Sequence, residues 1–330
     1  MKTNIDIAAR VNTAVIGAAG YAGGELLRLL FEHPRVDQVQ CISQSQAGKK
    51  LNSVHDDMFM YPDRLFDAEL SPCDIVFLCG DHGQSQNLIY THQVFQKADK
   101  VIDLSHDFRA GGQGFTYGLC EVYQEQLLGC SRIANPGCFA TTIQLALAPL
   151  AQQGLLKNTV HITALTGSTG AGQKLQKTSH FSQRSQNLST YKVFEHQHLD
   201  EIERTLGYLQ GAANPMPPLL FVPLRGPFTR GILASLYTDC DLSEDEVLNL
   251  YQRYYADAAF VHAGQEEINL KSVVNTNQVR IQLQKHEGIL HLVCCLDNLL
   301  KGASGQAVQN MNLIMNWPID SGLRLKPIAY

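Results

Sequence analysis

The sequence lacks an excess of basic residues and any long apolar run. Its 330 residues carry 26 Lys and Arg against 31 Asp and Glu, a formal net charge of -5. That balance leaves no strongly basic surface for nucleic acid or an anionic membrane. No apolar run approaches the roughly 20 residues that span a bilayer, and Met1–Arg10 has no signal-peptide core. We therefore expect a cytoplasmic protein that binds neither nucleic acid nor a membrane.

Disulfide and metal patterns are also missing. The nine cysteines are an odd number without regular spacing, and no two of them form Cys-x-x-Cys. None is spaced from a pair of histidines as in a zinc finger, so we expect no metal site. The default for each thiol is a small buried side chain, which makes any exceptional cysteine informative.

The two halves of the sequence differ in their pattern of apolar and polar residues, and the length suits two domains. In the first half, short apolar strands alternate with helices, which predicts a Rossmann-type, doubly wound parallel sheet. The expected strands are Val11–Ile16, Val36–Ser43, Asp74–Cys79 and Lys100–Leu104, and the expected helices run from Gly24 to about His33 and from about Gln84 to Gln96.

The second half favours an α+β domain with a largely antiparallel sheet. Apolar and polar residues alternate on both sides of the turn at 285–288, which predicts a hairpin with one solvated face. Ser243-x-x-Glu246 is a capping box that opens a helix, and a last helix is expected at about 302–316. We expect one domain from 1–137 together with about 300–330, and a catalytic and dimerisation domain at 138–299.

A glycine-rich turn follows the first strand. The pattern Gly17-x-x-Gly20-x-x-Gly23 lies where a Rossmann fold binds the pyrophosphate of a dinucleotide at a helix N-terminus. The candidate cofactor-binding residues there are Gly17, Ala19, Gly20, Tyr21, Ala22 and Gly23. The alternative is a tight turn that binds nothing.

The end of the second strand indicates which cofactor binds. It carries hydroxyls and lysines, including Ser43, Ser45 and Lys49, and no acid that would bind a ribose 2′-hydroxyl. We therefore predict NADP, with Ser43 and Ser45 as candidate contacts. The alternative is a polar loop with solvated lysines.

Cys138 differs from the other eight cysteines. It follows Asn135-Pro-Gly, and the apolar stripe of Phe139, Ile143, Leu147 and Leu150 places it at the first turn of a helix. Free amides and the helix dipole stabilise a thiolate there, lowering its pKa from about 8.5 toward neutrality. A thiolate is a nucleophile, although a thiol buried under a turn remains the alternative.

A thiolate beside a nicotinamide indicates attack on an acyl carbon or aldehyde, with hydride passing to or from the adduct. Such chemistry needs a general acid and base, a role that suits histidine. The densest polar cluster of the second half is Glu195–Glu201, which contains His196 and His198. A solvated helix is the alternative for either histidine.

Together the motifs resemble the N-acetyl-γ-glutamyl-phosphate reductase family, which is related to aspartate-semialdehyde dehydrogenase. The matching segments are 17–23, 103–109, 117–121, 135–138, 167–172, 196–202, 229–232 and 297–312. The resemblance implies NADPH-dependent reduction of N-acetyl-L-glutamyl 5-phosphate to the 5-semialdehyde with release of phosphate, through a cysteine thioester, in arginine biosynthesis. Two alternatives stay open: a related enzyme acting on another acyl phosphate, and a non-catalytic redox sensor that binds NADP.

The resemblance also implies residue roles and an assembly. The nucleophile falls on Cys138 and the acid/base on His198. The substrate-binding candidates are Arg109, Arg230, His196 and Glu201, and the further cofactor-binding candidates are Gly170 and Asn298. The family implies a homodimer or homotetramer. Gln44 stands where the family commonly has an arginine, which removes a cation that could face the 2′-phosphate.

Overall fold

The computed structural model describes residues 10–328, so the expectation about a signal peptide lies outside the described residues. The chain forms two compact units. One comprises the residues up to Pro136 together with Ala303–Arg324, and the other comprises Gly137–Gly302 with the residues from Leu325 onward. Residues 137, 300–302 and 325–328 were expected in the first domain and lie in the second unit.

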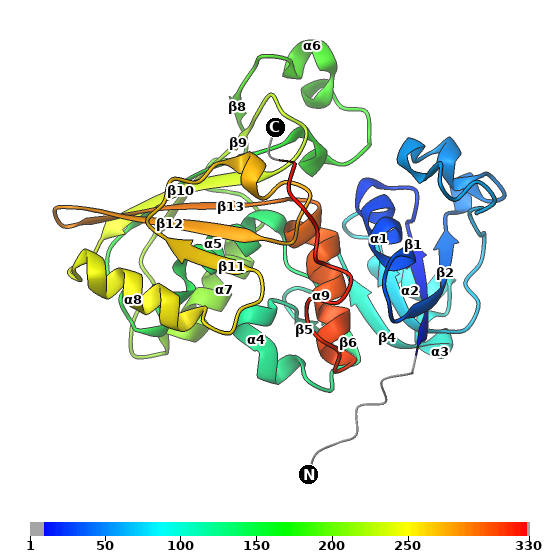
Figure 1. The fold of residues 1–330 in the computed structure, drawn as a ribbon, viewed down its shortest axis with the longest axis horizontal. Coiled ribbons are helices and arrows are strands. Elements are labelled where there is room, and N and C mark those ends of the chain that lie inside the picture. The colour runs from blue at the N-terminus through cyan, green and yellow to red at the C-terminus, as the bar shows by residue number, and fades with distance from the viewer. Residues whose placement is uncertain (1–9, 329–330) are drawn as a thin grey trace. The chain divides into compact units, whose positions relative to one another are not determined.

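The first unit is built on a six-stranded, all-parallel sheet with the strand order β2-β1-β3-β4-β6-β5 (Figure 1). Its strands are β1 (Val11–Ile16), β2 (Val36–Ile42), β3 (Cys73–Leu78), β4 (Ala98–Asp103), β5 (Thr116–Tyr117) and β6 (Arg132–Ala134). Its helices are α1 (Tyr21–Phe31), α2 (Ser85–Thr91), α3 (Val94–Lys97), α4 (Cys120–Leu127) and α9 (Gly305–Ile314). The C-terminal helix α9 packs with α1, α4 and β4.

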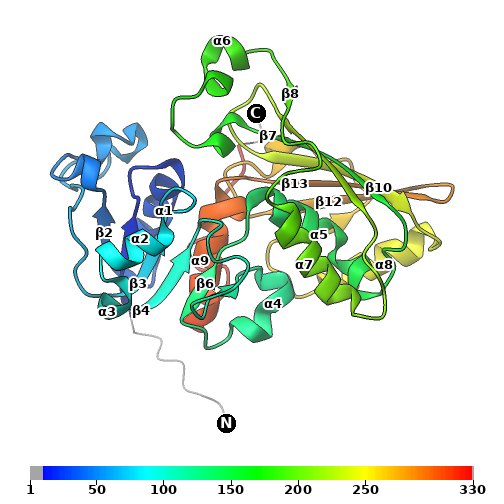
Figure 2. The same cartoon turned by 180° about the vertical axis from the view of Figure 1, so that it is seen from behind.

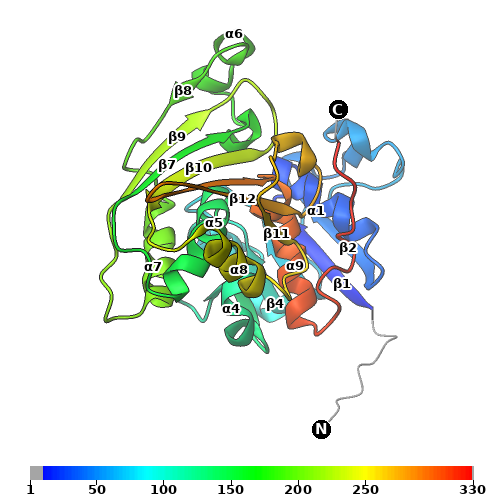
Figure 3. The same ribbon diagram turned by 60° about the vertical axis from the view of Figure 1, so that its left-hand side comes forward.

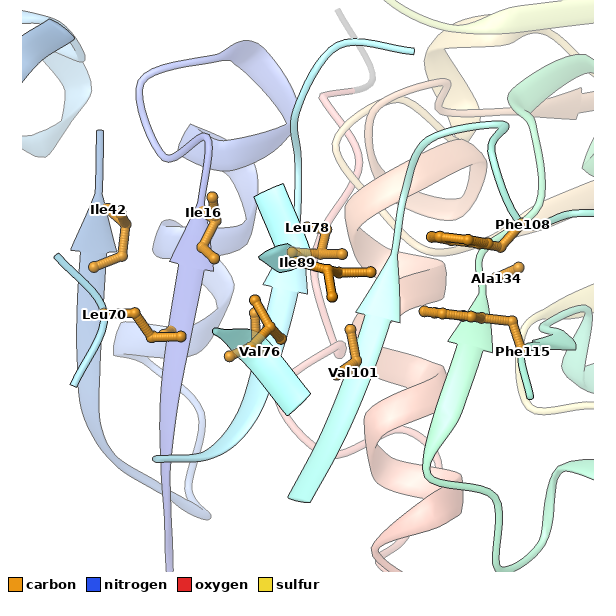
Figure 4. Close-up of a cluster of buried hydrophobic side chains, with 12 residues drawn as sticks. Ile16, Ile42, Leu70, Val76, Leu78, Ile89, Val101, Phe108, Phe115 and Ala134 are labelled. Carbon is orange, nitrogen blue, oxygen red and sulfur yellow. The ribbon is translucent and has the colours of Figure 1, made fainter. Parts of the chain in front are cut away.

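An apolar cluster on one face of this sheet forms part of the core (Figure 4). Its members come from neighbouring strands and from α2, and they include Ile16, Ile42, Val76, Leu78, Ile89 and Val101. The Phe108 and Phe115 rings stack beside them with centroids 4.2 Å apart. Near-continuous apolar strands of this kind are typical of a buried parallel sheet.

The second unit contains a seven-stranded mixed sheet with the order β11-β12-β13-β10-β7-β9-β8. Its strands are β7 (Val160–Thr166), β8 (Ser189–Thr190), β9 (Leu219–Arg225), β10 (Ile232–Asp239), β11 (Val261–Gly264), β12 (Val279–His286) and β13 (Ile289–Leu296). Its helices are α5 (Cys138–Gln152), α6 (Phe181–Arg184), α7 (Leu199–Gln210) and α8 (Glu244–Tyr254). Helix α5 contacts β10, β13 and α7, while α8 contacts β11 and β12, so these helices gather on one face of the sheet (Figures 2 and 3).

The expected fold class is confirmed, with the parallel sheet in one unit and the largely antiparallel sheet in the other. Only β7–β9 and β11–β12 are parallel pairs in the second sheet. The β12–β13 hairpin and the Ser243 capping box of α8 both form as expected. No helix among residues 10–328 has both the length and the apolar character needed to cross a membrane.

Two helix predictions were wrong in detail. The single helix expected at about 84–96 is broken, because Gln93 adopts a left-handed conformation with φ of 54° between α2 and α3. The last helix opens with a π-helical turn, Leu300–Ser304, before α9 begins at Gly305.

Candidate active site

Cys138 is the first residue of α5, as the apolar stripe predicted. The N-cap residue Gly137 has an extended backbone and no side chain caps the helix. The first-turn amides of a helix have no carbonyl partner within it, and they carry the positive end of its dipole. Cys138 is half-buried, whereas burial raises the pKa of Cys41 and Cys295 to about 12 and keeps those thiols protonated.

Glu201, in the first turn of α7, links the two candidate catalytic groups. One carboxylate oxygen, Oε2, accepts a hydrogen bond of 3.1 Å from the backbone amide of Gly137. The other, Oε1, lies 3.8 Å from Nε2 of His198. Gln144 adds a second contact between α5 and α7, because its side-chain amide donates to the backbone carbonyl of Glu201 at 2.8 Å. The structure therefore brings Cys138, His198 and Glu201 together at the start of two packed helices.

Both histidines of the predicted cluster are buried, at 5% exposure for His196 and 6% for His198, so the solvated-helix alternative is wrong. His196 lies among aromatic rings: its ring centroid is 5.4 Å from that of Phe139, 5.7 Å from that of Tyr191 and 5.5 Å from that of Phe221. Its Nδ1 accepts the backbone N–H of His198 at 3.2 Å. Burial, with the charges of Lys192 and Arg225, lowers the pKa of His196 to about 4.

Gly302 lies directly against Cys138. A Cβ atom built on Gly302 would lie 2.8 Å from the Cys138 Cβ and 3.2 Å from the Asp297 carbonyl oxygen. The Gly302 amide also donates to that carbonyl at 2.8 Å. The π-helical turn that Gly302 occupies can therefore approach Cys138 only because this residue has no side chain.

Tyr191 and Arg225 belong to the same neighbourhood, and sequence reasoning missed both. The Arg225 guanidinium lies over the Tyr191 ring, 4.8 Å from its centroid. Burial raises the pKa of Tyr191 to about 12, the charge of Cys138 adds to the rise, and Arg225 opposes it. No motif marks either residue, because their importance arises from contacts with distant parts of the chain.

Arg230 and Asn298, both predicted site residues, hold the loops beside β10 and β13. The Arg230 Nε donates to the fully buried carboxylate of Asp297 at 2.7 Å. The Asn298 side chain accepts the Gly231 amide at 2.6 Å and donates to the Thr169 hydroxyl at 3.1 Å. Gly170 lies in the adjoining 3-10 turn Ser168–Ala171. These contacts fix the segments that carry the candidates.

Arg109 lies in the first unit, 7% exposed. Its Nε donates to the carbonyl of Asn135 at 2.9 Å and its Nη2 donates to that of Leu104 at 3.2 Å. The guanidinium thereby fastens the loop after β4 to the segment after β6. No group of three or more His, Cys, Asp or Glu side chains within residues 10–328 could hold a metal ion.

Comparison with known proteins places the chain in a family. The semialdehyde dehydrogenase NAD binding domain matches residues 12–129, and the semialdehyde dehydrogenase dimerisation domain matches residues 138–298. N-acetyl-gamma-glutamyl-phosphate reductases of Phocaeicola vulgatus and Flavobacterium johnsoniae are each 46% identical to it, over 97% of this chain and 100% of theirs. The chain belongs to the N-acetyl-gamma-glutamyl-phosphate reductases of the semialdehyde dehydrogenase family. The resemblance expected from the motifs is confirmed.

Solved structures of semialdehyde dehydrogenases share its fold. Aspartate semialdehyde dehydrogenase II of Vibrio cholerae, complexed with ASA, gives a TM-score of 0.72 at 16% identity, over 94% of this chain and 99% of that chain. Aspartate semialdehyde dehydrogenase with NADP from Candida albicans gives 0.67 at 15% identity, over 93% and 99%. At these identities the likeness concerns the fold alone.

The glycine turn of this semialdehyde dehydrogenase fits a dinucleotide. Gly17 has φ of 86°, and a Cβ atom there would lie 2.6 Å from the Cys79 carbonyl oxygen. Gly23 is equally confined by Gly17 and Ala18, whereas Gly20 meets nothing closer than 3.5 Å. Gly20 is the N-cap of α1, and no side chain caps that helix. The turn therefore leaves backbone amides and open space for a pyrophosphate at the start of α1.

The end of β2 differs from the expectation in one respect. Ser43 is buried, while Gln44, Ser45 and Lys49 are exposed. The sequence showed no acid there, but the structure brings Asp67 to this strand end, where its carboxylate accepts the Cys41 amide at 3.0 Å. The acid comes from a segment that pairs with β2 at Ile42, and linear sequence alone could not reveal it.

Proposed function

We propose that this chain reduces N-acetyl-L-glutamyl 5-phosphate to N-acetyl-L-glutamate 5-semialdehyde with NADPH and releases phosphate, in L-arginine biosynthesis. The observation that carries the proposal is Cys138 at the uncapped start of α5, joined through Glu201 to His198. The substrate is inferred from the relatives named N-acetyl-gamma-glutamyl-phosphate reductase. The same names favour this activity over an enzyme for another acyl phosphate and over a sensor without catalysis.

In the proposed mechanism the Cys138 thiolate attacks the acyl carbon, a C–S bond forms, and phosphate leaves to give a thioester. The first-turn amides of α5 stabilise the thiolate and the negative oxygen of the tetrahedral adduct. NADPH, when bound, supplies the hydride that reduces the thioester carbon. His198 gives a proton to the oxygen of the hemithioacetal and takes it back as the C–S bond breaks, which releases the aldehyde and restores the thiolate.

The remaining residues position these groups. The Glu201 carboxylate stabilises a protonated His198 and holds the N-terminus of α5 through Gly137. Arg109 and Arg230 remain our candidates for the anionic groups of the substrate. Our candidates for binding NADP remain residues 17–23, Ser43, Ser45, Gly170 and Asn298.

We also propose a homodimer or homotetramer in the cytoplasm. The dimerisation domain that matches residues 138–298 supports self-association. The nine cysteines are all free thiols, which suits a reducing compartment that keeps Cys138 available.

The decisive experiment is the reverse reaction, phosphate-dependent reduction of NADP by the semialdehyde. Cys138→Ala should lose about a thousandfold or more of this activity while still binding NADP. Cys130→Ala, which alters a half-buried thiol of the first unit, should keep it. Near wild-type turnover by Cys138→Ala would overturn the mechanism, and faster turnover of aspartate semialdehyde would overturn the substrate. NAD in a parallel assay measures the cofactor preference.

A further inference from the structure

Arg225 is a positively charged residue beside the candidate site. It is the last residue of β9, and its guanidinium covers the Tyr191 ring at 4.8 Å. The Tyr191 ring contacts His196 at 5.7 Å, and His196 contacts His198 at 4.6 Å between ring centroids. The charge of Cys138 acts on Tyr191 as well. Arg225 is thus connected to the proposed acid/base His198 through ring contacts with Tyr191 and His196.

The charge of Arg225 is not neutralised within the described part of the chain. No carboxylate there forms an ion pair with Arg225, and its Nε is buried without a hydrogen-bond acceptor. Arg230, in contrast, is paired with Asp297 at 2.7 Å, and Arg109 donates to two carbonyl oxygens. Leaving a guanidinium N–H buried without an acceptor is costly, so a ligand atom is the natural partner for it.

A second arginine adds positive charge at the same strand end. Arg184 is 6% exposed, and its Nη1 donates to the backbone carbonyl of Arg225 at 2.7 Å. Its Nη2 donates to the Ser189 hydroxyl at 3.0 Å, while its Nε is also buried without an acceptor. Within residues 10–328 neither arginine has an acidic partner. Two arginines at one strand end, neither paired with a carboxylate, favour an anion beside them.

We propose that Arg225, supported by Arg184, binds an oxyanion of the substrate beside Cys138. Arginine suits carboxylate and phosphate because its planar group donates two parallel hydrogen bonds. The identity of the oxyanion rests on the proposed function: the acyl phosphate carries both a phosphate and an α-carboxylate. In the reverse direction these two groups arrive on separate reactants, inorganic phosphate and the semialdehyde, so kinetics can distinguish them.

The first test does not depend on turnover. Alkylation of Cys138 is followed by peptide mass spectrometry with iodoacetate, which is an anion, and with iodoacetamide, which is neutral. An oxyanion site beside the thiol accelerates iodoacetate selectively. Arg225→Gln should lower the iodoacetate-to-iodoacetamide rate ratio at least tenfold, Arg225→Lys should lower it less, and Arg253→Gln on the exposed side of α8 should leave it unchanged. An unchanged ratio in both Arg225 variants overturns the proposal.

The second test identifies the group. In the reverse reaction, Arg225→Gln should raise the KM for phosphate or the KM for N-acetylglutamate semialdehyde at least tenfold. A rise for phosphate assigns Arg225 to the phosphate, and a rise for the semialdehyde assigns it to the carboxylate. Two unchanged KM values contradict a substrate site. If the wild-type protein shows no phosphate-dependent turnover but its alkylation ratio falls in Arg225→Gln, the proposed function fails while the oxyanion site stands.

Discussion

At the residue scale, the structure distinguishes two possible roles of Glu201, substrate binding and positioning of His198, which the sequence resemblance could not distinguish. The resemblance made it a substrate-binding candidate, yet its two oxygens face the Gly137 amide at 3.1 Å and His198 Nε2 at 3.8 Å. A carboxylate placed in this way orients the histidine and stabilises its protonated form. We therefore regard it as a positioning residue.

Glu201→Gln tests that role. The amide keeps the size and one acceptor oxygen but removes the charge beside His198. We expect kcat to fall about a hundredfold, within the usual range of acid-base contributions, with the KM for the semialdehyde nearly unchanged. Glu203→Gln, an exposed change on the same helix, is the matched control. A rise in KM at constant kcat would instead assign Glu201 to the substrate.

His196 makes stability depend on pH. Its pKa is lowered to about 4 in the folded protein from 6.5, chiefly by burial, so between these values the unfolded chain binds the proton and the folded chain does not. Stability from this residue is therefore present above pH 6.5 and is lost as the pH falls toward 4. Between pH 7 and pH 4.5 the loss amounts to about 2 kcal/mol.

Urea unfolding at pH 7 and pH 4.5 measures this dependence. His196→Gln should reduce the difference between the two unfolding free energies by about 2 kcal/mol. His286→Gln, an exposed change at the end of β12, should leave that difference as it is in the wild type. An equal pH dependence in wild type and His196→Gln would show that the ring is protonated without penalty.

At the element scale, the approach of the π-helical turn Leu300–Ser304 to α5 depends on Gly302. In Gly302→Ala the new Cβ would lie 2.8 Å from the Cys138 Cβ, so the turn or the cysteine must shift. Displacement of a reacting group by about 1 Å can cost about a hundredfold in rate. We expect a loss of that order in kcat with cofactor binding retained.

The β12–β13 turn offers the matched glycine for that experiment. A Cβ on Gly288 meets nothing within 4 Å, so Gly288→Ala should keep full activity and a melting temperature close to that of the wild type. Full activity in Gly302→Ala as well would mean that the turn can move without disturbing Cys138.

Local signals account for the elements that could be predicted from the sequence. The apolar stripe after Gly137 fixes α5 and hence the place of Cys138, period-two alternation marks the β12–β13 hairpin, and the Ser243 box opens α8. The break at Gln93 and the π-helical turn at 300–304 carry no such signal, because surrounding structure imposes those backbone conformations.

The site residues also fall into those that the sequence could predict and those that it could not. Cys138, His196 and His198 belong to recognisable motifs. The burial of His196 depends on Phe139 and Phe221, which belong to α5 and β9. Arg225 is positioned by the contact of its guanidinium with the Tyr191 ring and by the pairing of its strand with Ser189. Contacts between segments this distant in sequence are not encoded in any local pattern.

At the scale of the whole molecule, no helix of the second unit within residues 10–328 covers one face of the seven-stranded sheet. Helices α5 and α8 contact the sheet on the other face. The strand positions that alternate with the buried ones carry half-buried apolar side chains, namely Leu165, Leu220, Val222, Leu224, Leu233 and Val293. Tyr237, 46% exposed, stacks on His161 on the same face. We infer that a second copy of the chain covers it, because an apolar surface of this kind marks an interaction site in the region matched by a dimerisation domain.

The double variant Val222→Lys, Leu233→Lys tests that interface. Two buried lysines on each side of a symmetric contact repel one another and lose hydration, so the assembly should dissociate. Size-exclusion chromatography with light scattering should give at least twice 36.5 kDa for the wild type and the mass of a single chain for the variant. Leu128→Lys, an exposed change in the first unit at 52% exposure, should keep the wild-type mass. If the double variant keeps that mass and folds, the subunits associate through another surface, and the sheet face stays open to solvent.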